Sequence, residues 1–226
     1  MQTSKAMPGS IGREVNATRA IGSVLGIIAG LSGLDHGFFE LLQGSTATPS
    51  LFVQSIGPAQ RMWAYGTEDA FTLVPNFLVT GLLAIAVGAS IIMWSIGLLD
   101  RKHRSSVLLA LGTALFLVGG GVAQVVFVVL GWVVSRRVGR PATAWQRVVP
   151  LRVGAALAGL WPALLVASVA LAAFALEVAI TGFVPGVTDP NQVQLVCWSA
   201  LGITLIVLAT AIVGGFAHDL QGTPDR

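Results

Sequence analysis

Long apolar stretches are the feature that most constrains how this chain folds. They occur at residues 20–43, 72–99, 107–134, 150–183 and 195–217, and charged residues lie mostly in the gaps between them. The hydrocarbon core of a bilayer is roughly 30 Å thick and requires about 20 apolar residues in a helix, which each stretch supplies. We therefore predict an integral membrane protein that crosses the bilayer several times.

The apolar stretches are predicted to be helices rather than strands. The chain is 54% hydrophobic and 10% charged, whereas soluble domains are about 25% charged. Residues 79–93 and 164–176 are continuously apolar or small, while transmembrane strands alternate apolar and polar residues over about 10 positions. The sequence predicts an all-α polytopic helical membrane protein, with residues 1–226 forming a single integral membrane domain.

Basic residues predict how the chain crosses the membrane. Lys and Arg number three in the 1–19 tail, one in the 44–71 loop, three just after residue 99 and five in the 135–152 gap. Because loops rich in Lys and Arg remain in the cytoplasm, we expect a cytoplasmic tail at 1–19 and an external loop at 44–71. Both later gaps are also expected to be cytoplasmic, but a single helix through 107–134 would place the 135–152 gap outside.

A glycine triplet offers a way to return the chain to its starting side. Gly119, Gly120 and Gly121 lie in the middle of the 107–134 stretch, and each glycine weakens a helix by about 1 kcal/mol relative to alanine. We predict four spanning helices plus a glycine-centred helical hairpin, with both termini cytoplasmic. The hairpin tip must be sheltered by protein or line a polar cavity. The alternative is one straight helix here, and hence five spanning helices.

Small residues recur along one face of the first helix. They are Gly22, Gly26, Gly30, Gly33 and Gly37. Intervals of three, four or seven residues place them on the same side of a helix, where small residues allow a neighbouring helix to approach closely. This pattern predicts a helix-packing face.

Polar residues of three segments are expected at one level near the external side. His36, Glu40 and Gln43 follow the helical i, i+4, i+7 spacing, Asn76 begins the second helix, and Glu177 lies late in an outward-running helix. Ionisable side chains inside a membrane are costly and often mark a functional path. We therefore predict a polar cluster made of these five residues.

The chemistry of this cluster has three possible interpretations. It is a hydrogen-bonded group that fixes helix register, a proton or cation site built on an imidazole and carboxylates, or a metal site in which His36 and Glu40 are joined by a third ligand. The sequence identifies no metal-ligand motif, no catalytic residue and no cofactor. The single cysteine, Cys197, is expected to pack as a small residue.

His218 and Asp219 follow the last apolar stretch. A histidine is favoured near the negative end of a helix dipole. We expect this pair to cap its own helix.

The function favoured by the sequence is a helix-packing structural or assembly component with an outward-facing polar cluster, rather than an enzyme. The alternatives are a small proton- or cation-coupled transporter or channel, and a metal-binding membrane enzyme. The expected partners are the lipid bilayer and either another membrane protein or a second copy of the chain. Nucleic acid is not expected, because the basic residues lie where juxtamembrane groups meet headgroups.

Five segments carry a resemblance to known sequences, namely 33–44 (GLDHGFFELLQG), 70–84 (AFTLVPNFLVTGLLA), 119–124 (GGGVAQ), 176–186 (LEVAITGFVPG) and 215–220 (GFAHDL). Together they resemble a group of small multipass bacterial membrane proteins to which no activity is assigned. The resemblance implies a single domain in the bacterial cytoplasmic (inner) membrane, and it implies no functional residue.

Overall fold

The computed structural model describes residues 16–97, 102–138 and 151–221. It confirms the predicted class, since four helices in this part of the chain are long and apolar enough to cross a membrane. They are α1 (Ala17–Leu42), α2 (Phe77–Gly97), α5 (Leu151–Thr181) and α6 (Pro190–Gln221). The predicted tail up to residue 15, and the basic residues Arg101, Arg140 and Arg147, lie outside the described residues.

The 107–134 stretch forms two short helices, α3 (Arg104–Leu117) and α4 (Gln124–Ser135). With 14 and 12 residues and a rise of about 1.5 Å per residue, neither helix spans a bilayer. They lie side by side, because a Cβ built at Gly112 would lie 2.2 Å from the Val128 side chain. The predicted hairpin is therefore confirmed, and the alternative of five spanning helices is wrong.

The chain reverses direction at the glycine triplet. Gly119 and Gly121 have φ angles of +92° and +97°, in a region that residues with a Cβ rarely adopt. All three glycines are buried. The hairpin tip is thus sheltered by protein, as the cost of exposing free backbone groups to lipid requires.

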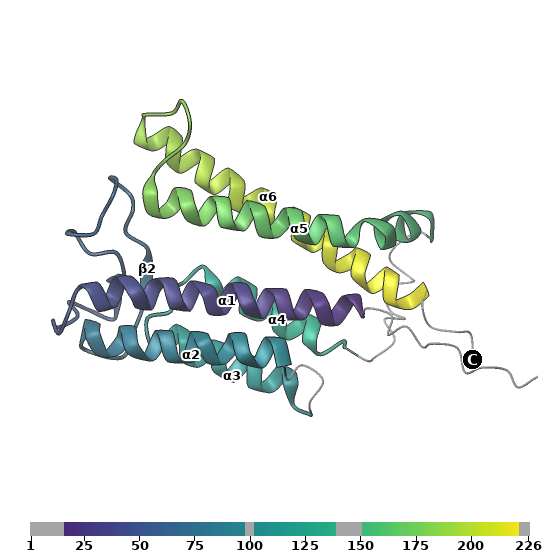
Figure 1. Ribbon diagram of the computed structural model, residues 1–226, viewed down its shortest axis with the longest axis horizontal. Coiled ribbons are helices and arrows are strands. Elements are labelled where there is room, and N and C mark those ends of the chain that lie inside the picture. Colours follow the sequence, from purple (N-terminus) through teal and green to yellow (C-terminus); the bar gives the residue numbers. More distant parts are fainter. Residues whose placement is uncertain (1–15, 98–101, 139–150, 222–226) are drawn as a thin grey trace, which may run out of the picture.

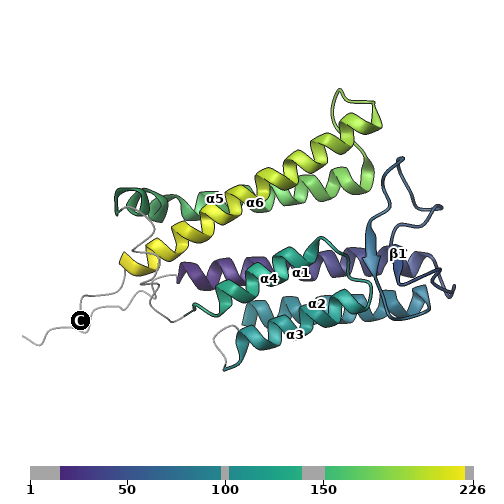
Figure 2. The same ribbon diagram turned by 180° about the vertical axis from the view of Figure 1, so that it is seen from behind.

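The segment between α1 and α2 covers one end of the bundle, which we call the loop end (Figures 1 and 2). It contains the antiparallel strands β1 (Phe52–Gln54) and β2 (Asp69–Phe71), paired with Val53 opposite Ala70. The backbone of β2 also binds the hairpin tip, since Gly119 N–H donates to the Phe71 carbonyl at 3.0 Å and Val122 N–H to the Asp69 carbonyl at 3.2 Å. The covering segment and the hairpin tip therefore form one connected structure.

Helix α1 packs against α2 through glycines on both helices. A Cβ at Gly30 would lie 2.6 Å from the Gly88 carbonyl oxygen, and a Cβ at Gly37 would lie 2.7 Å from the Gly81 carbonyl oxygen. Such close backbone approach is typical of small-residue helix interfaces in membranes. The α1–α2 contact thus depends on two glycine pairs, and the two glycines of each helix are seven residues apart.

The other α1 glycines face different neighbours. A Cβ at Gly26 would lie 2.0 Å from Ser95 Oγ of α2, and a Cβ at Gly33 would lie 2.7 Å from the Leu115 side chain of α3. Gly22 is buried as well. The predicted glycine face is therefore covered, over most of its length, by helices of this same chain.

Helices α5 and α6 pack against each other and form a layer beside α1–α4, as both Figure 1 and Figure 2 show. The layer joins α1 at the end opposite the loop end, which we call the terminal end, through a core that includes Ile21, Leu25, Leu208 and Phe216. Near the loop end, Trp63 Nε1–H donates to the Ala179 carbonyl at 2.8 Å. The α5–α6 layer is thus attached at both ends.

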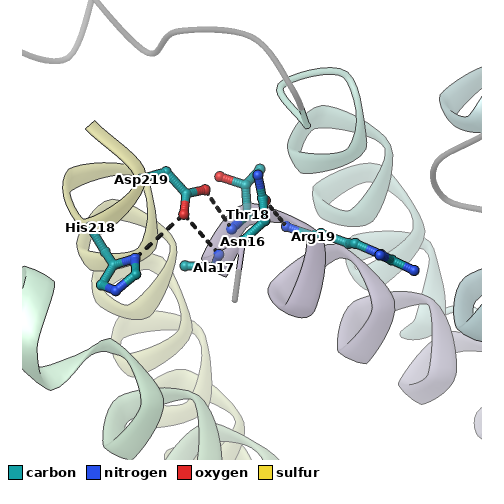
Figure 3. A network of polar contacts seen from close by, with 6 residues as sticks. All are labelled: Asn16, Ala17, Thr18, Arg19, His218 and Asp219. Carbon is teal, nitrogen blue, oxygen red and sulfur yellow. Dashed lines mark hydrogen bonds and ion pairs between the residues drawn. The ribbon is translucent and has the colours of Figure 1, made fainter. Parts of the chain in front are cut away.

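The terminal end is held by a cap that one helix supplies to another (Figure 3). Asp219 of α6 accepts hydrogen bonds from Ala17 N–H at 2.8 Å and from Thr18 N–H at 2.9 Å, while Asn16 accepts from Arg19 N–H at 2.8 Å. These donors are among the unsatisfied groups of the first α1 turn. Asp219 of α6 therefore caps α1, a contact that the sequence does not predict.

Candidate functional site

A buried polar line at the loop end joins α1 to the covering segment. Helix α1 contributes His36 and Glu40, which are 3% and 0% exposed. The covering segment contributes Ser55, which is 0% exposed, and Glu68, whose side chain is 20% exposed. We call Glu68, His36, Ser55 and Glu40 the polar line.

Successive members of the polar line are in contact. Glu68 Oε2 lies 3.4 Å from His36 Nε2, and His36 Nδ1 lies 2.9 Å from Ser55 Oγ. Ser55 Oγ donates to Glu40 Oε1 at 3.0 Å. The line therefore leads from a partly exposed carboxylate to a carboxylate that is completely buried.

The direction of the hydrogen bonds in the line depends on the state of Glu40. When Glu40 is ionised, Ser55 donates its hydroxyl proton to the carboxylate, and His36 then donates from Nδ1 to the Ser55 oxygen. The other ring nitrogen, His36 Nε2, faces Glu68 Oε2. The imidazole therefore connects Glu68 to Ser55 through its two nitrogens.

The hairpin tip closes over the polar line. A Cβ at Gly119 would lie 2.5 Å from Glu40 Oε1 and 2.8 Å from Thr80 Oγ1. A Cβ at Gly121 would lie 2.5 Å from His36 Nε2. The glycine triplet thus does two things, because it reverses the chain and brings backbone against the two buried ionisable residues.

Two other predicted residues lie beside the polar line and hold its surroundings. Gln43 Nε2 donates to the carbonyl of Gln54 at 3.0 Å and to that of Ser55 at 2.7 Å, which fixes Ser55 over α1. Asn76 donates to Ser45 Oγ at 3.2 Å and accepts from Val79 N–H at the start of α2. Both side chains connect segments of the loop end.

Glu177 does not join these residues. Its side chain is exposed, and its Oε1 accepts a hydrogen bond from Thr181, one turn later in the same helix, at 3.1 Å. The physical reason is that α5 belongs to the separate α5–α6 layer (Figure 1), so a matching depth along the bundle does not bring the side chains together. The predicted cluster of five is corrected to His36 and Glu40, with Gln43 and Asn76 nearby.

Ser55 is a member of the site that the sequence does not predict. It is a single serine in a loop without periodicity, and no local signal distinguishes it from Ser45 or Ser50. The pairing of Glu68 with His36 was not predicted either. Both contacts arise from the way the covering segment folds back onto α1.

A metal centre has no support in the part of the chain that the structure describes. Within residues 16–97, 102–138 and 151–221, no group of three or more His, Cys, Asp or Glu side chains is arranged to hold a metal ion. The predicted pair of His36 and Glu40 is bridged by Ser55 instead.

The fold and the site define a polytopic α-helical membrane protein with a glycine-centred helical hairpin over a buried polar line. Comparison with known proteins gives no match, whether with protein-family models, with curated proteins or with solved structures.

Proposed function

We propose that this protein handles protons in the membrane, as a small proton-coupled transporter or channel in which the polar line carries a proton between Glu68 and Glu40. The observation that carries this proposal is the unbroken series of contacts from Glu68 through His36 and Ser55 to Glu40. Ionisable residues buried in a membrane are costly to keep unless they pair or serve a path for ions. Here they do both.

The groups around the line are suited to moving a proton rather than holding a fixed charge. Asp35 of α1 and Cys197 of α6 are the other titratable groups near Glu68. Around Glu40, α2 contributes the Thr80 hydroxyl and the hairpin contributes glycine backbone, neither of which carries a charge. An imidazole can accept a proton at one ring nitrogen and release one from the other, and the two nitrogens of His36 contact Glu68 and Ser55.

The structural or assembly role is less well supported than proton handling. Its main motivation was the helix-packing face predicted from the α1 glycines. Gly30 and Gly37 contact α2, and Gly33 contacts α3, so these positions are occupied within the chain. A structural role would leave the polar line only the task of fixing helix register, although a core of apolar side chains would pack there without buried charges.

The proposed orientation places the loop end outside a bacterial cytoplasmic membrane and both termini in the cytoplasm. Among the described residues, Lys102, Arg104, Arg136 and Arg137 lie at or beyond the helix ends of the terminal end, while the covering segment contains Arg61. This asymmetry follows the positive-inside rule. Glu68 would then receive protons from the external side.

Proton flux in proteoliposomes tests the proposal. The purified chain is reconstituted in liposomes that contain a pH-sensitive dye, and proton entry is followed after a pH step. We expect Glu40→Gln to lower the proton flux by about a hundredfold, as the loss of a proton-transfer group does, because the amide still accepts from Ser55 but cannot take up a proton.

Glu177→Gln is the matched control, since Glu177 is exposed and bonded within its own helix, and its flux is expected to equal that of the unaltered chain. Equal flux in the Glu40 variant and the unaltered chain, with both eluting as single folded species, would refute the proposal. So would the absence of any flux above that of empty liposomes.

A further inference from the structure

A second buried polar group lies at the hairpin tip, next to the polar line but not part of it. Gln124 is the first residue of α4 and is 1% exposed. Neither its amide oxygen nor its amide nitrogen has a hydrogen-bond partner among the residues that the structure describes. Glu40 Oε2 likewise has none within the described ranges, although Glu40 Oε1 is bonded to Ser55.

Buried polar atoms of this kind call for an explanation. More than nine in ten buried polar groups in proteins have a hydrogen-bond partner, and an unsatisfied buried amide is destabilising. A leucine or methionine at position 124 would fill a similar volume without this penalty. The side chain of Gln124 therefore points to a polar ligand that it contacts when the protein is in its working state.

The glycine triplet brings the two unsatisfied groups under the same turn. The Cβ position of Gly119 lies 2.6 Å from Glu40 Oε2, and that of the next residue, Gly120, lies 2.8 Å from Gln124 Nε2. The absence of side chains on these glycines lets both polar groups reach the backbone of the tip. Glu40 and Gln124 thus approach consecutive residues from different helices, α1 and α4.

The chemistry of the two groups selects the ligand. Gln124 offers both N–H donors and an acceptor oxygen, and a carboxylate oxygen is an acceptor. A metal cation would satisfy the oxygens but would face the amide N–H groups unfavourably. Water satisfies all of them, because it accepts from Nε2 while it donates to the carboxylate, and buried waters typically make about three such bonds.

We propose that Glu40 and Gln124 form a water-binding site beneath the hairpin tip, which extends the proton path from α1 to α4. This inference rests on the proposed function, since it assigns the next hydrogen-bond partner of Glu40. Protonated Glu40 donates a hydrogen bond to the bound water and ionised Glu40 accepts one from it, while the Gln124 N–H donates to the water oxygen in both states and holds the water in place. Gln124 is a positioning residue, because it binds no proton itself.

Infrared difference spectroscopy tests this site directly. Spectra of the reconstituted protein are recorded across a pH step in ordinary water and in water labelled with oxygen-18, which shifts the stretching bands of bound water only. We expect an isotope-sensitive band in the unaltered chain that is lost in Gln124→Met, while the carboxyl band of Glu40 remains. Proton flux in this variant is expected to fall about tenfold or more.

Ser135→Ala is the matched control, because the Ser135 hydroxyl is also buried without a partner among the described residues but lies at the other end of α4. It is expected to keep the water band and the flux. Gln124→Leu gives a second apolar variant if Gln124→Met does not fold.

An isotope-sensitive band that persists in a folded Gln124 variant would overturn the water site, and so would unchanged flux. If flux still depends on Glu40 in that case, the proposed function stands and this inference alone fails. If flux is independent of Glu40, the proposed function fails first.

Discussion

Alanine at Gly119 tests whether the hairpin tip is built around the buried carboxylate of Glu40. The added Cβ would lie 2.5 Å from Glu40 Oε1, so the carboxylate that accepts from Ser55 must shift. Gly186 provides the matched control, because it also has a positive φ, +78°, but a Cβ there meets nothing within 4 Å. The comparison separates backbone strain from the loss of close approach.

The two substitutions are expected to differ by about the free energy of one buried hydrogen bond. Gly186→Ala carries only the strain of a left-handed residue, about 1–2 kcal/mol. Gly119→Ala carries similar strain and also disrupts the Ser55–Glu40 hydrogen bond, which adds about 1.5–3 kcal/mol when the acceptor is charged. We therefore expect Gly119→Ala to lower the free energy of unfolding by about 2.5–5 kcal/mol.

Reversible unfolding in mixed detergent micelles, followed by circular dichroism, measures both variants and the double variant of Gly119→Ala with Glu40→Ala. Removing the carboxylate relieves most of the overlap, so we expect a coupling of about 2 kcal/mol between the two positions. Equal destabilisation by Gly119→Ala and Gly186→Ala, or additive effects in the double variant, would refute this description of the tip.

Two further predictions concern how the helices are held together. Asp219→Ala removes two hydrogen bonds to the first turn of α1, and we expect it to lower the free energy of unfolding by about 2 kcal/mol. The control Asp189→Ala removes a cap from its own helix and is expected to lower this free energy by only about 1 kcal/mol. Equal losses in the two variants would argue against the α1–α6 link. Gly30→Ala places a Cβ 2.6 Å from a backbone carbonyl of α2, so we expect overpacking to lower the free energy of unfolding by about 2–3 kcal/mol. In the control Gly202→Ala of α6, the added Cβ meets nothing within 4 Å. We expect this control to leave the free energy of unfolding unchanged or to raise it by up to about 1 kcal/mol. Thermal unfolding in lipid nanodiscs checks both pairs.

Features that depend on local composition were predictable from the sequence. Hydropathy identified α1, α2, α5 and α6, because a bilayer requires long apolar helices. The hairpin followed from two independent signals, arginines on both sides of a stretch and a glycine triplet inside it. The spacing of His36 and Glu40 placed both on the buried side of α1 for the same reason, since one helical turn separates them.

Features that depend on contacts distant in sequence were not predictable in the same way. Asp219 caps a helix that begins about 200 residues earlier, and no local pattern distinguishes this from a cap of its own helix. Ser55 reaches His36 only because Gln43 and the strands fold the covering segment onto α1. The prediction that Glu177 joins the cluster was wrong because equal depth in the membrane does not determine which layer a helix joins.

The protonation of Glu40 is the most direct test of a proton-handling polar line. Infrared spectra of the reconstituted protein, titrated between acidic and alkaline pH, report the carbonyl stretch of a protonated carboxyl group as it gains or loses its proton. We expect a reversible carboxyl band that disappears in Glu40→Gln and persists in Glu177→Gln. A set of carboxyl bands that is identical in the unaltered chain and in Glu40→Gln would contradict the account.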